Sequence, residues 1–142
     1  MPSYIAGVFY HCGIATALIY LFIALFNITV SGTIIVIAQV LMLMGGLCGA
    51  GLLIKRIMSE PMRVISYIDD YASNIIVDIF ILTALLCSRM PAFIPVMFIV
   101  AIIMFLYIPV GKIRHCFFFF LTRILFGTYY GRRGVFPAEK HY

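Results

Sequence analysis

Residues 33–54, TIIVIAQVLMLMGGLCGAGLLI, form an apolar stretch without a single charged side chain. A helix rises about 1.5 Å per residue, and about 20 apolar residues are needed to cross a hydrocarbon layer roughly 30 Å thick. The stretch is therefore long enough to cross a membrane once as a helix. Three further stretches have the same character, with Asp78 as the one charged residue inside them: 4–27, 71–88 and 92–111.

The composition of the whole chain agrees with this interpretation. Of its 142 residues, 65% are hydrophobic and 11% are charged, and the mean hydropathy is +1.16. Soluble domains have about 45–50% apolar and about 25% charged residues, so a water-soluble fold is excluded. A β-barrel is disfavoured because the stretches lack period-2 alternation and exceed the length of one barrel strand. The sequence predicts an all-α integral membrane protein, a four-helix transmembrane bundle with no room for a soluble catalytic domain.

The basic residues fall almost entirely on one side of this bundle. Only Arg89 falls on the other side. Because Lys and Arg accumulate in cytoplasmic loops, we expect both termini and the middle loop to be cytoplasmic, in the cell membrane. The net charge of +5 then reflects topology and gives no reason to expect nucleic-acid binding. The basic residues on the predicted cytoplasmic side are Lys55, Arg56, Arg63, Lys112, Arg114, Arg123, Arg132, Arg133 and Lys140.

The fourth stretch continues beyond residue 111 as an apolar, aromatic pattern interrupted by single basic residues. We expect one long helix over 92–121, bent near Pro109 because proline removes a backbone donor. Residues 1–126 would then form the transmembrane domain. Residues 127–142 form a basic tail, which is either an ordered or partner-bound cytoplasmic extension or a frayed end that meets anionic headgroups.

Two histidines are the strongest candidates for chemistry. At 1.5 Å per residue, His11 and His115 each lie about 10 Å from the inner end of their predicted helix. Two imidazoles at one depth on different membrane helices are what a bis-histidine haem b requires. The alternative is that each ring hydrogen-bonds a neighbouring carbonyl or sits at the interface. The four cysteines form no CxxC or CxxCH, which gives no support for covalent haem or an iron–sulfur cluster in this chain.

Glycines in the second stretch have two interpretations. Gly45 and Gly49 have the small-xxx-small spacing that lets a neighbouring helix, or a flat macrocycle, approach the backbone closely. Gly46 lies beside them. Gly45 and Gly46 are therefore candidates for a cofactor-binding surface as well as for helix packing.

Three acidic residues lie in or beside the third stretch. Asp78, with Asn74 one turn before it, either carries protons or hydrogen-bonds a quinone head group, or forms a buried structural pair. Asp69 and Asp70 begin the helix, where negative charge favours the N-terminal end of the helix dipole. Capping is the expected role of these two residues.

Several short motifs occur in a particular order along the chain: FYHCG at 9–13, Gly45 and Gly46, LLIKR at 52–56, EPMR at 60–63, DDY at 69–71 and IPVGKIRH at 108–115. This order resembles the respiratory nitrate reductase gamma subunit family of cytochromes b. The family includes membrane subunits of heterodisulfide-reductase-like and sulfite-reduction-associated complexes. The likeness runs over most of the chain, and the spacing of Pro109, Lys112 and His115 is its most specific part.

The resemblance implies a helical bundle that holds b haems and passes electrons between the quinone pool and an iron–sulfur partner. Family members have five helices and two haems, and the resemblance implies that the first stretch of this chain matches the second family helix, without a counterpart of the first. His11 and His115 take the positions of the axial iron ligands of the haem nearer the cytoplasm. Basic residues around that level would pair with the haem propionates, contribute to a quinone site, or only mark topology; they include Arg56, Arg63 and Arg114.

Two departures from the family pattern narrow the prediction. Leu21 and Met97 or their neighbours occupy the places where histidines bind the family's second haem, and leucine offers no ligand atom. The predicted outer loop at 29–32 lacks the lysine that the family's outer quinol site uses. We therefore expect one haem b, on the cytoplasmic side, and these residues argue against an outer quinol site of that kind.

The leading hypothesis is a single-haem membrane subunit of a respiratory oxidoreductase complex, not catalytic alone. It would pass electrons between menaquinone or another quinone and an iron–sulfur subunit on the cytoplasmic face. The first alternative is a haem-free anchor for a peripheral redox subunit. The second is a small transporter or channel subunit, which is disfavoured because one acidic group lies in the spans and no inverted repeat is visible.

Overall fold

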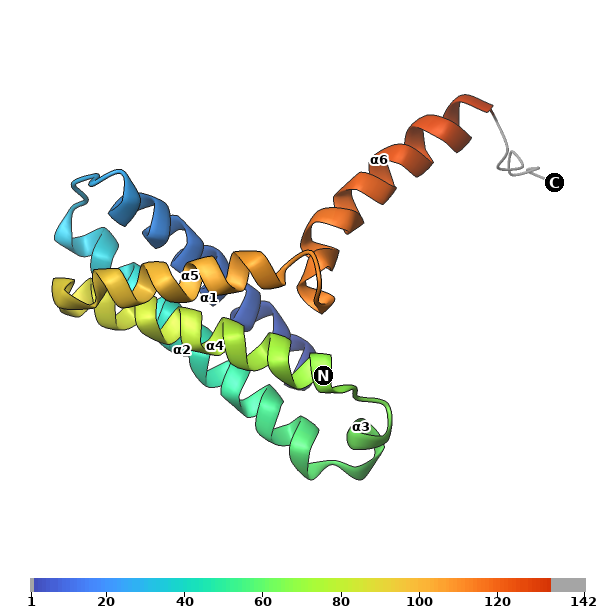
Figure 1. Ribbon diagram of the computed structural model, residues 1–142, viewed down its shortest axis with the longest axis horizontal. Coiled ribbons are helices and arrows are strands. Elements are labelled where there is room, and N and C mark those ends of the chain that lie inside the picture. The colour runs from blue at the N-terminus through green and yellow to red at the C-terminus, as the bar shows by residue number, and fades with distance from the viewer. Residues whose placement is uncertain (1, 134–142) are drawn as a thin grey trace.

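The computed structural model describes residues 2–133, and within them all regular secondary structure is helical (Figure 1). This confirms the predicted all-α class. The elements in chain order are α1 (Pro2–Leu25), α2 (Gly32–Met58), α3 (Glu60–Val64), α4 (Ile68–Arg89), the 3-10 helix η1 (Pro91–Phe93), α5 (Ile94–Tyr107), the 3-10 helix η2 (Lys112–Arg114) and α6 (His115–Arg133).

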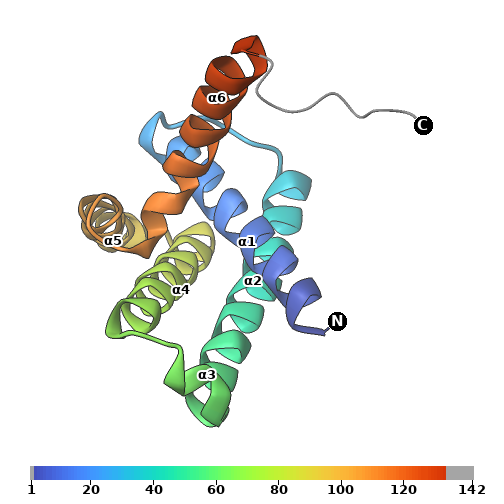
Figure 2. The ribbon, with the colours of Figure 1, turned by 90° about the vertical axis from the view of Figure 1, so that its right-hand side faces the viewer.

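The long helices pack mainly against their neighbours in the chain, α1 on α2, α2 on α4 and α4 on α5, and α4 also contacts α1 (Figure 2). At the crossing of α1 and α2, Gly13 faces Gly45, and a Cβ on Gly13 would lie 2.7 Å from the Gly45 Cα. Glycine at both positions lets the two backbones touch. Nearer the end of α2, the Lys55 ammonium donates a hydrogen bond to the Ser3 hydroxyl of α1.

The hydrophobic core between these helices is narrow. Its largest fully buried side chains are Met42 of α2, Phe80, Ile81 and Cys87 of α4, and Met97 of α5. Around it, every long helix exposes large apolar side chains, a surface that suits lipid and not water. α1, α2 and α4 are each long and apolar enough to cross a membrane. The strongly bent segment of η1, α5, η2 and α6 would add up to one further crossing.

The charged segment 55–70, predicted as the middle loop, is largely helical. α2 continues through Lys55 and Arg56 to Met58, because these long basic residues are good helix formers and do not end the helix. α4 begins with a capping interaction in which the Tyr67 N–H donates to the Asp70 carboxylate at 2.9 Å. The predicted capping role is confirmed for Asp70, whereas the Asp69 carboxylate instead accepts hydrogen bonds from Tyr107 and Lys112.

The helix predicted over 92–121 is not continuous. α5 ends at Tyr107, and α6 begins at His115. The helical segments on the two sides of the break meet at 80°. The predicted bend near Pro109 is present, but the chain leaves the helix there and does not curve through it, since proline offers no N–H to continue the ladder.

The break is held open by a hydrogen bond to another helix. Gly111 is extended, with φ −92° and ψ −179°. The backbone N–H of Lys112, which a continuous helix would use internally, donates to the Asp69 carboxylate of α4 at 2.8 Å. This contact comes from a residue 43 positions earlier in the chain, so the sequence of the fourth stretch alone does not show it.

α6 also extends past the domain boundary predicted at residue 126. It runs to Arg133, so the first residues of the predicted tail belong to the same helix as the preceding aromatic run. Figure 1 shows α6 leaving the bundle. Residues 134–142 of the predicted tail lie outside the described residues.

Candidate functional site

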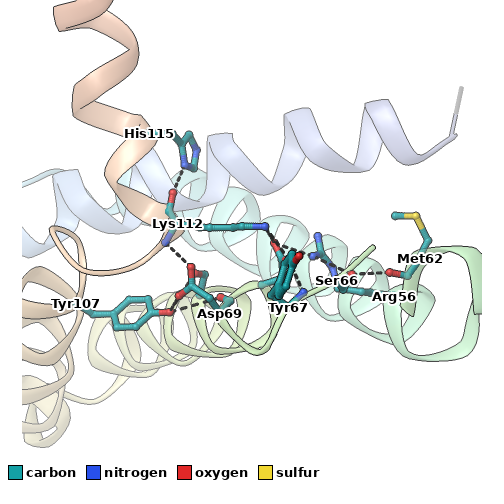
Figure 3. A network of polar contacts seen from close by, with 10 residues as sticks. Arg56, Met62, Ser66, Tyr67, Asp69, Tyr107, Lys112 and His115 are labelled. Atoms are coloured by element: carbon teal, nitrogen blue, oxygen red, sulfur yellow. Dashed lines mark hydrogen bonds and ion pairs between the residues drawn. The ribbon is translucent and has the colours of Figure 1, made fainter. Parts of the chain in front are cut away.

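A polar network joins the ends of α2 and α4 to η2 (Figure 3). Asp70 accepts from Arg56 of α2 at 3.1 Å and from Lys112 of η2 at 2.8 Å. Asp69 accepts from the Tyr107 hydroxyl and from the Lys112 backbone N–H. The two adjacent carboxylates therefore connect three parts of the chain. The members of this polar network are Arg56, Ser66, Tyr67, Asp69, Asp70, Ser73, Tyr107 and Lys112.

His115 is attached to the polar network through Lys112. Its ring is exposed, and its Nδ1–H donates to the Lys112 carbonyl at 2.5 Å (Figure 3). A carbonyl oxygen only accepts, so Nδ1 carries a proton and Nε2 is the acceptor nitrogen of the neutral ring. The Cys116 sulfur lies 4.0 Å from Nε2.

His11 has the same arrangement on α1. Its Nδ1–H donates to the Gly7 carbonyl at 2.7 Å, one helical turn earlier, and its ring is exposed. The Nε2 atom is again the acceptor nitrogen, because Nδ1 carries the proton. His11 lines a shallow, open and almost entirely apolar depression along α1, to which Tyr4, Val8 and Ala15 also contribute.

Each histidine ring hydrogen-bonds a neighbouring carbonyl, the alternative that the sequence left open, and the two imidazoles are also the donor type that a bis-histidine haem b needs. Each imidazole offers Nε2, and each Nδ1–H is held by a backbone carbonyl, the outer partner that fixes the tautomer of metal-binding histidines. His11 and His115 come from different elements, and their rings do not touch within residues 2–133. That part of the chain also holds no cluster of three or more His, Cys, Asp or Glu side chains placed around a metal ion. The residue types, two imidazoles on different elements, are those that would hold a b-type haem.

The two glycines proposed for a cofactor surface face other helices. Gly45 is buried against Gly13 of α1. Gly46 faces α4, where an added Cβ would lie 3.6 Å from the Ile81 side chain. Both positions therefore contribute to helix packing, the alternative that the sequence left open.

The three predicted arginines differ in how they are engaged. Arg56 is partly buried and forms the ion pair with Asp70. Arg63 on α3 and Arg114 in η2 are exposed, and within residues 2–133 neither side chain has an ion-pair partner. Arg63 and Arg114 are thus the ones free to meet an anionic group.

A second polar cluster lies inside the bundle, between α1, α2 and α4. The Asn74 amide donates to the Asp78 carboxylate at 2.9 Å and to the Tyr10 hydroxyl at 3.2 Å. The other carboxylate oxygen of Asp78 is buried and has no hydrogen-bond partner among the described residues. Gly49 makes room for it, because an added Cβ would collide with Asp78 and with the Tyr10 ring. The sequence left open that Asp78 forms a buried structural pair with a polar or basic neighbour, and the structure gives Asn74 as its polar neighbour.

Tyr10 is the member of this cluster that the sequence did not indicate. Its place follows from the crossing of α1 and α2, which are antiparallel. Gly13 faces Gly45 at the crossing. Tyr10 lies one turn before Gly13 on α1, and Gly49 lies one turn after Gly45 on α2, so Tyr10 faces Gly49. If the crossing of α1 and α2 at Gly13 and Gly45 had been known, the position of Tyr10 beside Gly49 could have been predicted.

The polar features that the structure brings together are the network around Asp69 and Asp70, with His115 attached, and the cluster around Asp78. His11 stands apart from both, on an exposed face of α1. Comparison of the chain with protein-family models, with curated proteins and with solved structures finds no match.

Proposed function

We propose that this chain is a membrane subunit that holds one haem b between His11 and His115 and takes part in electron transfer. The observation that carries the proposal is the state shared by the two imidazoles. Both have Nδ1–H bonded to a carbonyl, at 2.7 Å for His11 and 2.5 Å for His115, so Nε2 is the acceptor nitrogen of each ring, and on His115 it lies 4.0 Å from the Cys116 sulfur. That is the tautomer in which histidine binds iron through Nε2.

Haem, when bound, supplies reversible one-electron transfer. The chain supplies the ligands, an apolar wall and charge. The depression beside His11 provides apolar contact. Arg63 and Arg114, the predicted arginines without an ion-pair partner in the described part of the chain, are the ones to neutralise the two propionates. Arg56 is already paired with Asp70 and serves the fold.

A single haem is supported by the outer half of the bundle. Leu21 is 6% exposed and Met97 is fully buried, and both belong to the hydrophobic core. Beyond His11 and His115, the chain contains only His141, the next-to-last residue of the sequence. No second pair of imidazoles is therefore present in the sequence for another haem of this kind.

The proposed electron-transfer partners, and the side of the membrane on which they bind, are inferred from the charge distribution and from the resemblance. Nine of ten basic residues lie toward the predicted cytoplasmic side, where the polar network and His115 also lie. We propose that the haem exchanges electrons with a quinone, such as menaquinone, and with an iron–sulfur subunit docked on that side. The chain then acts as part of an oxidoreductase complex in the cell membrane and not as an enzyme by itself.

Absorption spectroscopy tests this proposal. The chain purified from membranes should show a reducible b-type band, and electron paramagnetic resonance should show a low-spin ferric signal from two axial imidazoles. His11→Ala and His115→Ala should each remove both signatures. His141→Ala is the matched control and should leave them unchanged. A b-type band that survives in His11→Ala would overturn the ligand assignment.

A haem-free anchor is the second candidate, and one observation favours it. α6 leaves the bundle with apolar side chains exposed along its length, a shape suited to holding another protein at the membrane. In that case the purified chain would have no b-type band and would still bring its peripheral redox partner with it.

A further inference from the structure

α6 is an apolar helix that stands at a steep angle to a candidate membrane span. The segment from Lys112 to Gly131 lies at 80° to the segment from Pro91 to Tyr107 (Figure 1). In its first three turns, all large apolar side chains are more than half exposed, from Phe117 at 58% to Phe126 at 59%. α6 packs appreciably only against η2, so among residues 2–133 no helix of the bundle covers this surface.

The angle is built into the fold by contacts around the break. The Lys112 backbone N–H is tied to Asp69 of α4, and the Lys112 ammonium is tied to Asp70 at 2.8 Å. Gly111 is buried against the Tyr107 ring, where an added Cβ would lie 2.9 Å from the phenolic oxygen. These contacts fix the direction in which the chain leaves α5, so the turn is not the fraying of a helix end.

The side chains of α6 are arranged as those of a helix at a membrane surface. At about 100° per residue, Phe117, Leu121, Ile124 and Thr128 share one face, which carries no charge over the first three turns. Arg123 lies about 120° around the helix from Phe117, next to the opposite face with Phe119 and Phe126, and two further arginines end the helix, Arg132 at the edge of the first face. Aromatic residues flanked by basic residues are characteristic of helices that lie at the boundary between acyl chains and anionic headgroups.

We propose that α6 lies in the plane of the membrane interface, with its uncharged face in the acyl region and its arginines on anionic lipid headgroups. The reason is geometric. η1 and α5 together hold 17 residues, at the lower end of the range of about 17–25 residues that one crossing needs. If α5 is tilted by about 20° from the membrane normal, as spans commonly are, then α6 lies within about 30° of the membrane plane. This surface location goes beyond the proposed haem function and does not depend on it.

The proposal gives a numerical expectation for depth. From Phe117 to Thr128 the helix axis advances about 16 Å at 1.5 Å per residue. Within 30° of the plane, the depth in the bilayer changes by about 8 Å or less over that length. Over the similar length from Val96 to Leu106 in α5, it changes by about 14 Å.

Tryptophan scanning measures this difference, because the chain contains no tryptophan. Single tryptophans replace, one at a time, Phe117, Leu121, Ile124 and Thr128 in α6. A matched control series replaces exposed residues of α5: Val96, Ile99, Ile103 and Leu106. The full chain is reconstituted in nanodiscs of phosphatidylcholine and phosphatidylglycerol, and depth is measured by quenching with lipids brominated at different acyl positions.

The expected result is a shallow depth that varies little across the α6 series, beside a steep gradient across the α5 series. Omitting phosphatidylglycerol, or making the double substitution Arg132→Gln and Arg133→Gln, should move the α6 tryptophans toward water by a few Å. A gradient in α6 as steep as that in α5 would overturn the proposal, because α6 would then continue the crossing. Tryptophans in α6 that lipid does not quench at all would also overturn it.

Discussion

Gly13 of α1 and Gly45 of α2 face each other with no room for a side chain on either: a Cβ on Gly45 would lie 2.6 Å from the Gly13 Cα, and one on Gly13 would lie 2.7 Å from the Gly45 Cα. Neither obstacle is a flexible side chain, so the two backbones would have to move apart. This crossing places Tyr10 over Gly49 and sets the register of α1 against the rest of the bundle. His11 follows Tyr10 and is directed outward by the same register.

Gly45→Ala should therefore destabilise the bundle by about 1–3 kcal/mol, the usual cost of overpacking a tight contact. The measurement is the midpoint of thermal unfolding of the purified chain in detergent. Gly51→Ala is the matched control, since Gly51 lies on the same helix with nothing within 4 Å of an added Cβ. Equal midpoints for the two variants would show that the glycine crossing is not what holds α1 against α2.

The Asp78 cluster gives a prediction that separates structure from function. Asn74→Ala removes the donor to both Asp78 and Tyr10, and should cost about 1–3 kcal/mol because buried acceptors lose their partner. Asp78→Asn keeps the shape and removes the charge, and should leave the unfolding midpoint unchanged or higher. Quinol-driven haem reduction is then measured in Asp78→Asn. A loss of that reaction in a stable, haem-loaded variant would contradict the structural role and assign proton transfer to Asp78.

The ion pairs of Asp70 should contribute modestly. The Asp70 side chain is 11% exposed, but Arg56 and Lys112 are 28% and 53% exposed, so solvent screens both pairs. We expect Asp70→Asn to lower stability by about 1 kcal/mol at low salt, with a smaller difference at high salt. Glu60→Gln, at an exposed acidic residue of α3, is the control and should have no measurable effect. A salt-independent loss would mean that the capping hydrogen bond to Tyr67 dominates.

Gly111 should control the direction of α6. In Gly111→Ala the new methyl group meets the Tyr107 ring, so either the ring or the chain after it must shift. Distances between spin labels on α4 and α6, measured by pulsed electron paramagnetic resonance, should change or broaden. Gly127→Ala, within α6 and with open space around the added Cβ, should leave the distances as they are. An unchanged distribution in Gly111→Ala would show that the ring yields and the angle is set elsewhere.

Much of the fold is local and could be predicted from the sequence. Each apolar stretch gives a helix because its own residues decide its length, and Asp70 caps α4 because it stands three residues after Tyr67. The break between α5 and α6 is different. Pro109 predicts a bend, but the 80° turn depends on Asp69 of another helix binding the Lys112 backbone. Only the packed structure brings those groups together.

The candidate site was predictable to a similar extent. His11 and His115 stand out in the sequence because they are the histidines within the predicted spans. Their hydrogen bonds to carbonyls three or four residues earlier are also local. The pairing of Arg56 with Asp70 and the place of Tyr10 beside Asn74 join residues far apart in the chain. Periodicity contains no information about such pairs.

The haem content of the purified chain tests the central claim most directly. Conversion of the bound haem to its pyridine complex, with quantification against protein by amino-acid analysis, gives the number of b haems per chain. The account predicts one for the wild-type chain and for His141→Ala, and none for His11→Ala or His115→Ala. A wild-type chain with no haem, or with two, would contradict it.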